Sequence, residues 1–126
     1  EERPDFHLSV RTGWMNDPNG FSYYNGQYHL FYQYNPYAPR WDSMHWGHAV
    51  TKDFLHWDYL PAALAPDEAY DRDGCFSGSA VTLPDGRQLL MYTGVLRERK
   101  ENGEHCDTQT QCLAVGGRRH LLLRSR

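Results

Sequence analysis

Short apolar and aromatic stretches, separated by turn residues, fill the chain from residue 21 onward. Residues 21–24 and 27–34 flank Asn25-Gly26, a pair favoured in two-residue hairpin turns because both positions accept positive φ. Similar stretches at 46–51, 54–60, 76–83, 87–95 and 109–115 are typical of strands, and 61–73 and 97–107 are typical of loops. No stretch has the 3.6-residue apolar period of an amphipathic helix. The pattern therefore predicts an all-β chain.

An internal repeat indicates how the strands are grouped. Gly26 and Gly86 lie 60 residues apart in two turns, and at the same offset Leu30 matches Leu90 and Tyr32 matches Tyr92. Each copy holds about four short strands, and a recurring four-stranded unit is typical of a β-propeller. A β-sandwich also fits so sparse a repeat. A propeller needs at least four blades, so the two copies here predict about two blades of a larger one.

Composition narrows the possible partners. The net charge of −3 gives no basic face, so nucleic acid is not an expected partner. No apolar run approaches the ~18 residues of a membrane span, so a membrane is not expected either. Cys75, Cys106 and Cys112 are odd in number and irregularly spaced, which indicates free thiols rather than a disulfide framework or a zinc site.

Aromatic residues make up 14% of the chain and gather between residues 21 and 59. Flat rings pack against the C–H faces of sugars, but aromatic residues also fill β cores. His45 and His48 are outnumbered by neighbours that do not bind metals, so they do not indicate a metal site, and we expect them to hydrogen-bond within the β core.

Asp17 is the first candidate for chemistry. The run Asp17-Pro18-Asn19-Gly20 has the composition of a β-turn. Asn16 and Asn19 flank the carboxylate with amides that can hydrogen-bond it or a sugar hydroxyl, and such donors keep an Asp ionised, as a nucleophile requires. An ordinary turn would contain the same residues, so the local pattern alone leaves both interpretations open.

Five ordered blocks together resemble glycoside hydrolase family 32. His7 with Trp-Met-Asn-Asp-Pro-Asn-Gly (14–20) is similar to the family's nucleophile signature, and it is followed by Phe-Tyr-Gln-Tyr-Asn-Pro (31–36), His-Trp-Gly-His-Ala (45–49), Asp-Arg-Asp-Gly-Cys-Phe-Ser-Gly-Ser-Ala (71–80) and Leu-Met-Tyr-Thr-Gly (90–94). The resemblance implies a five-bladed β-propeller with its site in the central funnel. It also implies hydrolysis of terminal β-fructofuranosides (sucrose, sucrose 6-phosphate or fructans) by a retaining double displacement, without cofactor or metal.

The resemblance also implies roles for particular residues. Asp17 matches the nucleophile, and the substrate-binding residues are expected to be Asn16, Asn19, Gln33, Trp41, Phe76 and Ser77. The expected partner is a small carbohydrate. The blocks are closest in wording to bacterial sucrases and sucrose-6-phosphate hydrolases. Together with free thiols, which are typical of a reducing compartment, this favours a bacterial cytoplasmic location over secretion.

The chain also departs from the family. Val10 stands where the family usually has Pro, and neither the Arg-Asp-Pro motif nor the Glu-Cys motif that carries the acid/base occurs. Glu68, Glu98, Glu101 and Glu104 lie in segments with loop composition and match no acid/base motif. We therefore expect fructoside hydrolysis as the family function and no activity from this chain by itself.

The departure is largest after Gly116. Residues 1–116 are expected to be the N-terminal portion of a catalytic propeller. Residues 117–126 form a basic stretch with four arginines and no acid. It is a surface tail, a basic amphipathic end or a product of a shifted reading frame.

Two alternative functions stay open. The chain is either a non-catalytic carbohydrate-binding or structural fragment, or a fructosyltransferase. Open blade edges would favour self-association.

Overall fold

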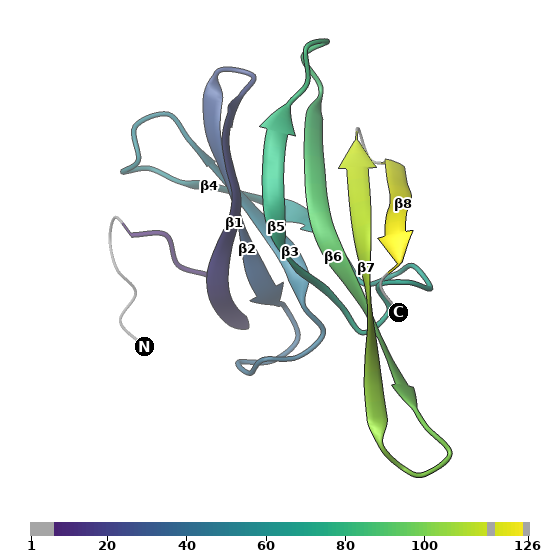
Figure 1. Ribbon diagram of the computed structural model, residues 1–126. Helices are drawn as coiled ribbons and strands as arrows, with labels where there is room; N and C mark the ends of the chain where they lie inside the picture. The colour runs from purple at the N-terminus through teal and green to yellow at the C-terminus, as the bar shows by residue number, and fades with distance from the viewer. Residues whose placement is uncertain (1–6, 116–117, 125–126) are drawn as a thin grey trace.

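The computed structural model describes residues 7–115 and the backbone of residues 118–124, and the regular structure in them is all β (Figure 1). The strands are β1 (Trp14–Tyr24), β2 (Gln27–Asn35), β3 (His45–Thr51), β4 (Asp58–Leu64), β5 (Gly74–Thr82), β6 (Gln88–Arg99), β7 (His105–Val115) and β8 (Arg118–Arg124). They form two antiparallel four-stranded sheets, ordered β1-β2-β3-β4 and β5-β6-β7-β8. The prediction of an all-β chain is confirmed. The described residues include no helix capable of crossing a membrane.

The 60-residue repeat corresponds to one sheet per copy. Asn25 and Gly26 form the β1–β2 turn with φ values of 51° and 77°, the conformation expected from the sequence. Gly86 has a φ of 83° in the β5–β6 turn. Leu30 and Tyr32 lie on β2, and their counterparts lie on β6, so each pair occupies the second strand of its sheet.

Several strand boundaries differ from the sequence prediction. Residues 61–64 belong to β4 rather than to a loop. Proline has no backbone N–H to donate, but β4 is an edge strand with no further strand beyond it, so Pro61 is tolerated there. Residues 54–57 form a turn before β4. The β6–β7 hairpin extends into the predicted loop, pairing Arg97 with Asp107. This extension is polar on both faces, so it lacks the apolar alternation by which strands are recognised.

Residues 118–124 were not expected to form a strand. Their backbone forms β8, which is hydrogen-bonded to β7 from the pair Val115–Arg118 to the pair Thr110–Arg124 and completes the second sheet. Residues 117, 125 and 126 of the basic stretch lie outside the described residues.

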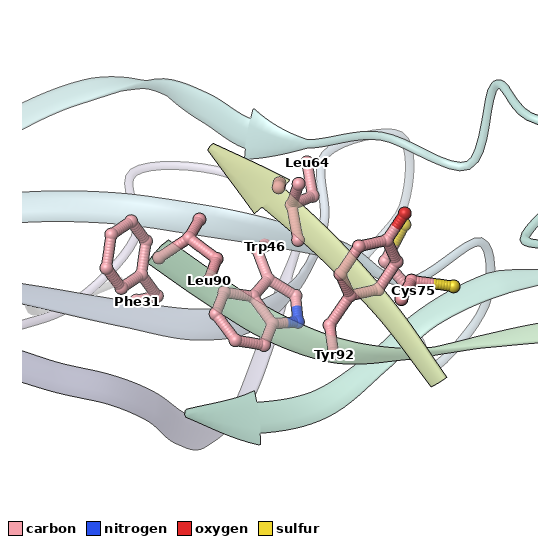
Figure 2. Packing of buried hydrophobic residues seen from close by; sticks show 8 residues of the cluster. Phe31, Trp46, Leu64, Cys75, Leu90 and Tyr92 are labelled. Atoms are coloured by element: carbon pink, nitrogen blue, oxygen red, sulfur yellow. The ribbon is translucent and has the colours of Figure 1, made fainter. Parts of the chain in front are cut away.

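The two sheets pack face to face around one apolar core (Figure 2). The first sheet contributes Phe31, Trp46 and Leu64, and the second contributes Cys75, Leu90, Tyr92, Cys112 and Ala114. Trp46 has no exposed surface and donates its indole N–H to the backbone oxygen of Phe76 at 2.9 Å. Burial of each large side chain contributes about 1.5–3 kcal/mol, so this core holds the sheets in a fixed relation.

Polar contacts set β1 and β5 beside each other (Figure 1). Gln88 donates a hydrogen bond to the Ser22 hydroxyl at 2.7 Å, and the Thr82 hydroxyl donates to the Tyr23 carbonyl at 3.3 Å. The Cys75 amide donates to the Met44 carbonyl at 2.8 Å. The first strands of the two sheets therefore run side by side, and residues from both can contribute to one site.

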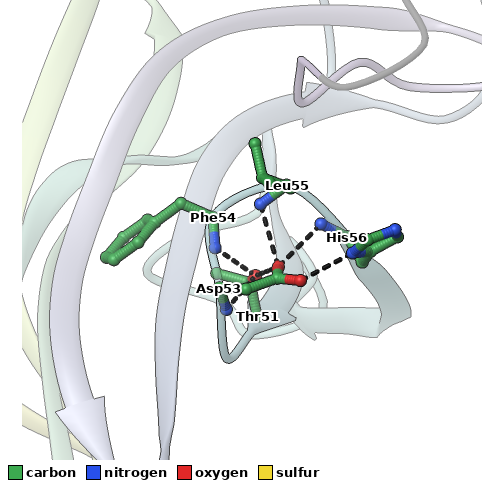
Figure 3. Close-up of polar contacts among 5 residues, drawn as sticks. All are labelled: Thr51, Asp53, Phe54, Leu55 and His56. Atoms are coloured by element: carbon green, nitrogen blue, oxygen red, sulfur yellow. Dashed lines mark hydrogen bonds and ion pairs between the residues drawn. The ribbon is translucent and has the colours of Figure 1, made fainter.

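The β3–β4 turn is held by a dense set of short hydrogen bonds (Figure 3). The Asp53 carboxylate accepts the backbone N–H groups of Leu55 and His56 at 2.9 and 2.8 Å, and the His56 ring at 2.6 Å. The His56 backbone N–H and ring, followed by the Leu55 N–H, hold the pKa of Asp53 well below its ordinary value. The same pairing raises the pKa of His56. The turn therefore has a defined shape at the surface.

Candidate functional site

Asp17 lies at an irregular point of β1. Pairing with β2 is regular at Met15–Tyr34 and resumes at Pro18–Tyr32, so Asn16 and Asp17 together face Gln33 alone. Such a β-bulge inserts one extra residue and redirects the neighbouring side chains. The prediction of a turn at residues 17–20 is therefore wrong. Its turn-forming residues are accommodated inside the strand by this bulge and by a second irregularity between Asn19 and Ser22.

The side chains at this bulge differ in exposure. Asp17 is exposed, which leaves its carboxylate accessible to a substrate. Asn16 is half-buried, and its amide oxygen accepts the indole N–H of Trp14 at 3.2 Å. Gln33 is only 3% exposed and donates its amide N–H to the Cys75 carbonyl at 3.0 Å. The bulge therefore joins an accessible acid to a buried amide that contacts the second sheet.

A second bulge lies on β5. Phe76 pairs with Thr93 and Gly78 pairs with Tyr92, so Ser77 is the extra residue. Ser77 is exposed. The ring of Phe76 contacts Trp41 edge-on, with centroids 5.7 Å apart, and Trp41 is 48% exposed in the loop between β2 and β3. Phe76 and Trp41 thus form an aromatic wall next to the carbonyl that Gln33 contacts.

Six of the seven residues expected at the site are linked by these contacts. Asn16, Asp17 and Gln33 share one bulge, Gln33 reaches the residue before Phe76, and Phe76 connects Ser77 with Trp41. Asn19 is placed differently. It pairs with Phe31, so it faces the interface between the sheets, where it is 4% exposed. Its amide nitrogen has no hydrogen-bond partner among the described residues.

The candidate site has one accessible carboxylate in its bulge, and a retaining glycosidase needs two about 5–5.5 Å apart. Glu98 lies on the β6 hairpin rather than in a loop, and Glu68, Glu101 and Glu104 are exposed outside the strands. Within the part of the chain that the structure describes, no three His, Cys, Asp or Glu side chains gather in a way that could hold a metal ion.

Two polar pairs, the first partly buried and the second fully buried, accompany the site. His48 contacts His29 across β2 and β3 at 2.8 Å, and the His45 ring contacts the Ser43 carbonyl. The expectation that His45 and His48 hydrogen-bond in the core is therefore confirmed. No sequence signal identified His29 as the partner of His48, because the strand register creates that pair.

The second pair joins Tyr92 to Asp71. Asp71 is fully buried, and the Tyr92 hydroxyl donates to its carboxylate at 2.7 Å. Burial, together with the neighbouring Asp71 carboxylate, raises the pKa of Tyr92 far above its ordinary value. The pair fixes the connection that leads into β5. No sequence signal indicated this pair, because Asp71 lies in a stretch of loop composition.

Comparison with known proteins identifies relatives over nearly the whole chain. The model for the "Glycosyl hydrolases family 32 N-terminal domain" matches residues 7–122. The chain is 51% identical over 112 residues to a sucrose-6-phosphate hydrolase of Zymomonas mobilis, covering 89% of this chain and 22% of that protein. It is 50% identical over 112 residues to a raffinose invertase of Escherichia coli, covering 89% and 23%. The chain thus spans less than a quarter of the length of these relatives.

A solved structure shows the same arrangement of strands. The family 32 β-fructofuranosidase of Bombyx mori matches with a TM-score of 0.75 and 42% identity, covering 95% of this chain and 25% of that one. The chain belongs to glycosyl hydrolase family 32, and its two sheets are blades from the N-terminal part of that family's five-bladed β-propeller.

Proposed function

We propose that this chain carries the nucleophile half of a β-fructofuranosidase site, with Asp17 as the nucleophile. The observation that carries the proposal is the bulge in β1, which exposes Asp17 directly opposite Gln33. Names among the relatives support the substrate class: they include sucrose-6-phosphate hydrolases and β-fructofuranosidases, and a mutant of the Bombyx mori enzyme is solved in complex with sucrose.

The chemistry assigned to Asp17 is the first displacement. Its carboxylate attacks C2 of the fructosyl unit, the C2–O bond to glucose breaks, and the electron pair leaves with the glucosyl oxygen. The products are a fructosyl ester on Asp17 and glucose, once an acid has protonated the oxygen. Water then cleaves the ester and releases fructose. Trp41 and Phe76 form an apolar wall for the sugar, and Ser77 and Asn16 supply hydrogen-bonding groups beside it.

The second half of the site, which supplies the acid/base, is proposed to lie on a motif that does not occur in this chain. No acid/base motif of the family occurs in the chain, and general acid catalysis contributes typically about 10²–10⁴-fold. The chain alone is therefore proposed to carry out the first displacement only when the leaving group departs without a proton.

A fructosyl fluoride donor tests this proposal, because fluoride leaves without general acid catalysis. We expect incubation with this donor to add one fructosyl unit to the chain, detected by intact-mass spectrometry and mapped to Asp17 by peptide sequencing. Asp17→Asn should remain unmodified, whereas the exposed control Asp67→Asn should react like the parent. An unmodified parent chain, or an adduct that persists in Asp17→Asn, would show that Asp17 is not the nucleophile.

A further inference from the structure

The loop between β2 and β3, residues 36–44, carries Trp41 and is closed by one buried side chain. β2 ends at Asn35, which is only 2% exposed. Its amide oxygen accepts the Tyr37 backbone N–H at 3.0 Å, and its amide nitrogen donates to the Arg40 carbonyl at 2.9 Å. The Asn35 side chain therefore ties the start of the loop to the peptide group that joins Arg40 to Trp41.

Asn35 is itself held at the end of a paired strand. Its backbone pairs with Trp14 at the start of β1. A Cβ added at Gly13 would lie 2.1 Å from the Asn35 carbonyl oxygen, so the chain before β1 packs directly against this end of β2. The side chain that closes the loop therefore projects from a fixed point of the first sheet, as a residue that supports a site should.

The other end of the loop is also held by hydrogen bonds. The Ser43 backbone N–H donates to the Asp42 carboxylate at 2.8 Å, and the His45 ring hydrogen-bonds the Ser43 carbonyl. Ser43 has a φ of 43°, which is uncommon for a residue with a side chain. Such strain persists only where the surroundings impose it. The loop is therefore constrained on both sides of Trp41.

Trp41 depends on this support because its side chain is 48% exposed. β2 ends and β5 begins at the same end of the two sheets, so the loop brings the Trp41 ring edge-on to Phe76, with centroids 5.7 Å apart (Figure 1). A ring on a mobile loop would lose conformational freedom when a sugar binds, which weakens binding. A loop that is already closed reduces this loss.

We propose that Asn35 is a positioning residue of the candidate site, which acts through Trp41 and touches no substrate itself. Its two hydrogen bonds hold the loop so that the Trp41 ring stays beside Phe76, where the sugar binds. The inference rests on the proposed function, because it requires that Trp41 contacts the substrate. It adds to that function a buried residue whose contribution to substrate binding is indirect.

Asn35→Asp removes the closing hydrogen bond with little change of shape. The carboxylate can still accept the Tyr37 N–H, but it has no N–H to donate and it repels the Arg40 carbonyl. We therefore expect the loop to open at Arg40. Asn35→Leu removes both hydrogen bonds without adding a charge, and it replaces the first variant if circular dichroism shows that the aspartate prevents folding.

The rate at which the fructosyl fluoride donor labels Asp17, measured against donor concentration, tests the proposal. We expect Asn35→Asp to raise the half-saturating concentration about three- to tenfold, as loss of one aromatic contact would. The maximal rate should stay within about twofold of the parent, because a residue that acts only on binding leaves it unchanged.

Asn102→Asp is the matched control. Asn102 closes the β6–β7 turn with the same two amide atoms: its oxygen accepts the Glu104 N–H at 3.0 Å, and its nitrogen donates to the Glu104 carboxylate at 3.1 Å. This variant should label like the parent.

A double-mutant cycle shows whether Asn35 acts through Trp41. Trp41→Ala alone should raise the half-saturating concentration, and Asn35→Asp in that background should add less than about twofold, because both changes remove the same contact. A full effect in that background, no effect in the parent, or a loss confined to the maximal rate would each overturn this proposal alone. A parent chain that is not labelled would overturn the proposed function and this inference with it.

Discussion

Asp17 is accessible because the strand that carries it is irregular. In a regular strand, one residue would lie opposite Gln33, whereas here there are two. Asp17 would then follow the alternation of buried and exposed positions. The extra residue instead turns the carboxylate outward beside a glutamine that is itself held by the second sheet. The chemistry proposed for Asp17 thus depends on residues of both sheets.

Asn19 is expected to lower the stability of the chain. Its buried amide nitrogen has no partner among the described residues, and an unsatisfied buried group of this kind costs about 1–3 kcal/mol. We predict that Asn19→Leu raises the free energy of unfolding by about 1 kcal/mol. Urea denaturation measures this effect. A clear loss of stability would contradict the expectation, since it would indicate that the amide is satisfied.

His48 should make the chain sensitive to acid. His29 donates one ring N–H to the Tyr24 carbonyl, so its other nitrogen accepts the N–H of a neutral His48. Burial, and to a smaller extent the charge of His29, lower the pKa of His48 to about 4 from its ordinary 6.5. Between these two values the unfolded chain binds a proton that the folded chain does not, so stability falls as the pH falls.

The expected loss from pH 7 to pH 4 is about 1 kcal/mol, reduced from the full shift because the ring is partly exposed. It corresponds to a decrease of about 3–5 °C in Tm for a chain of this size. Thermal melts of the parent and of His48→Gln, which keeps a donor but does not titrate, measure it. Equal pH slopes for the two proteins would rule out His48 as the cause.

At the scale of elements, bulges place the candidate site residues, and a glycine makes the β5 bulge possible. A Cβ at Gly78 would lie 1.9 Å from the Met91 carbonyl oxygen and 2.8 Å from the Tyr92 Cα, both backbone atoms of the paired strand. The strand can therefore resume pairing after Ser77 only without a side chain at position 78.

We predict that Gly78→Ala lowers the free energy of unfolding by about 3 kcal/mol, at the upper end for overpacking, because backbone atoms must move. Gly86→Ala is the control: a Cβ there meets nothing within 4 Å, and its positive φ costs only about 1–2 kcal/mol. Chemical denaturation of both variants gives the comparison. Equal losses would mean that the β5 bulge relaxes easily and does not need glycine.

At the scale of the whole molecule, the two sheets form a packed pair that is part of a propeller. The core between them is continuous, and Trp46 at its centre is fully buried and hydrogen-bonded (Figure 2). On the sides that face away from this core, Phe21 and Tyr23 of the first sheet and Val81 and Met91 of the second are exposed, as expected of two blades from a five-bladed fold. An assembled funnel would need further blades, and the acid/base motif that the family resemblance implies does not occur in this sequence.

We therefore predict that the chain releases no glucose from sucrose above the rate of the Asp17→Asn variant. A coupled glucose assay at high protein concentration measures this, with a complete family enzyme as the positive control. Glucose release that disappears in Asp17→Asn would contradict the prediction. It would mean that associated copies supply a second carboxylate.

The sequence alone determined the all-β class, the two hairpin turns and the repeat of one four-stranded unit, because turn residues and alternating apolar positions act locally. The blocks that resemble the family also indicated Asp17 and the residues expected around it. Only the tertiary structure decided that 17–20 is bulged strand rather than turn, and that His29 meets His48. It likewise decided that Gln33 contacts the second sheet and that the amide nitrogen of Asn19 is left without a hydrogen-bond partner among the described residues. These features depend on strand register and on the packing of two sheets, which bring together residues far apart in the chain and are therefore absent from any local pattern.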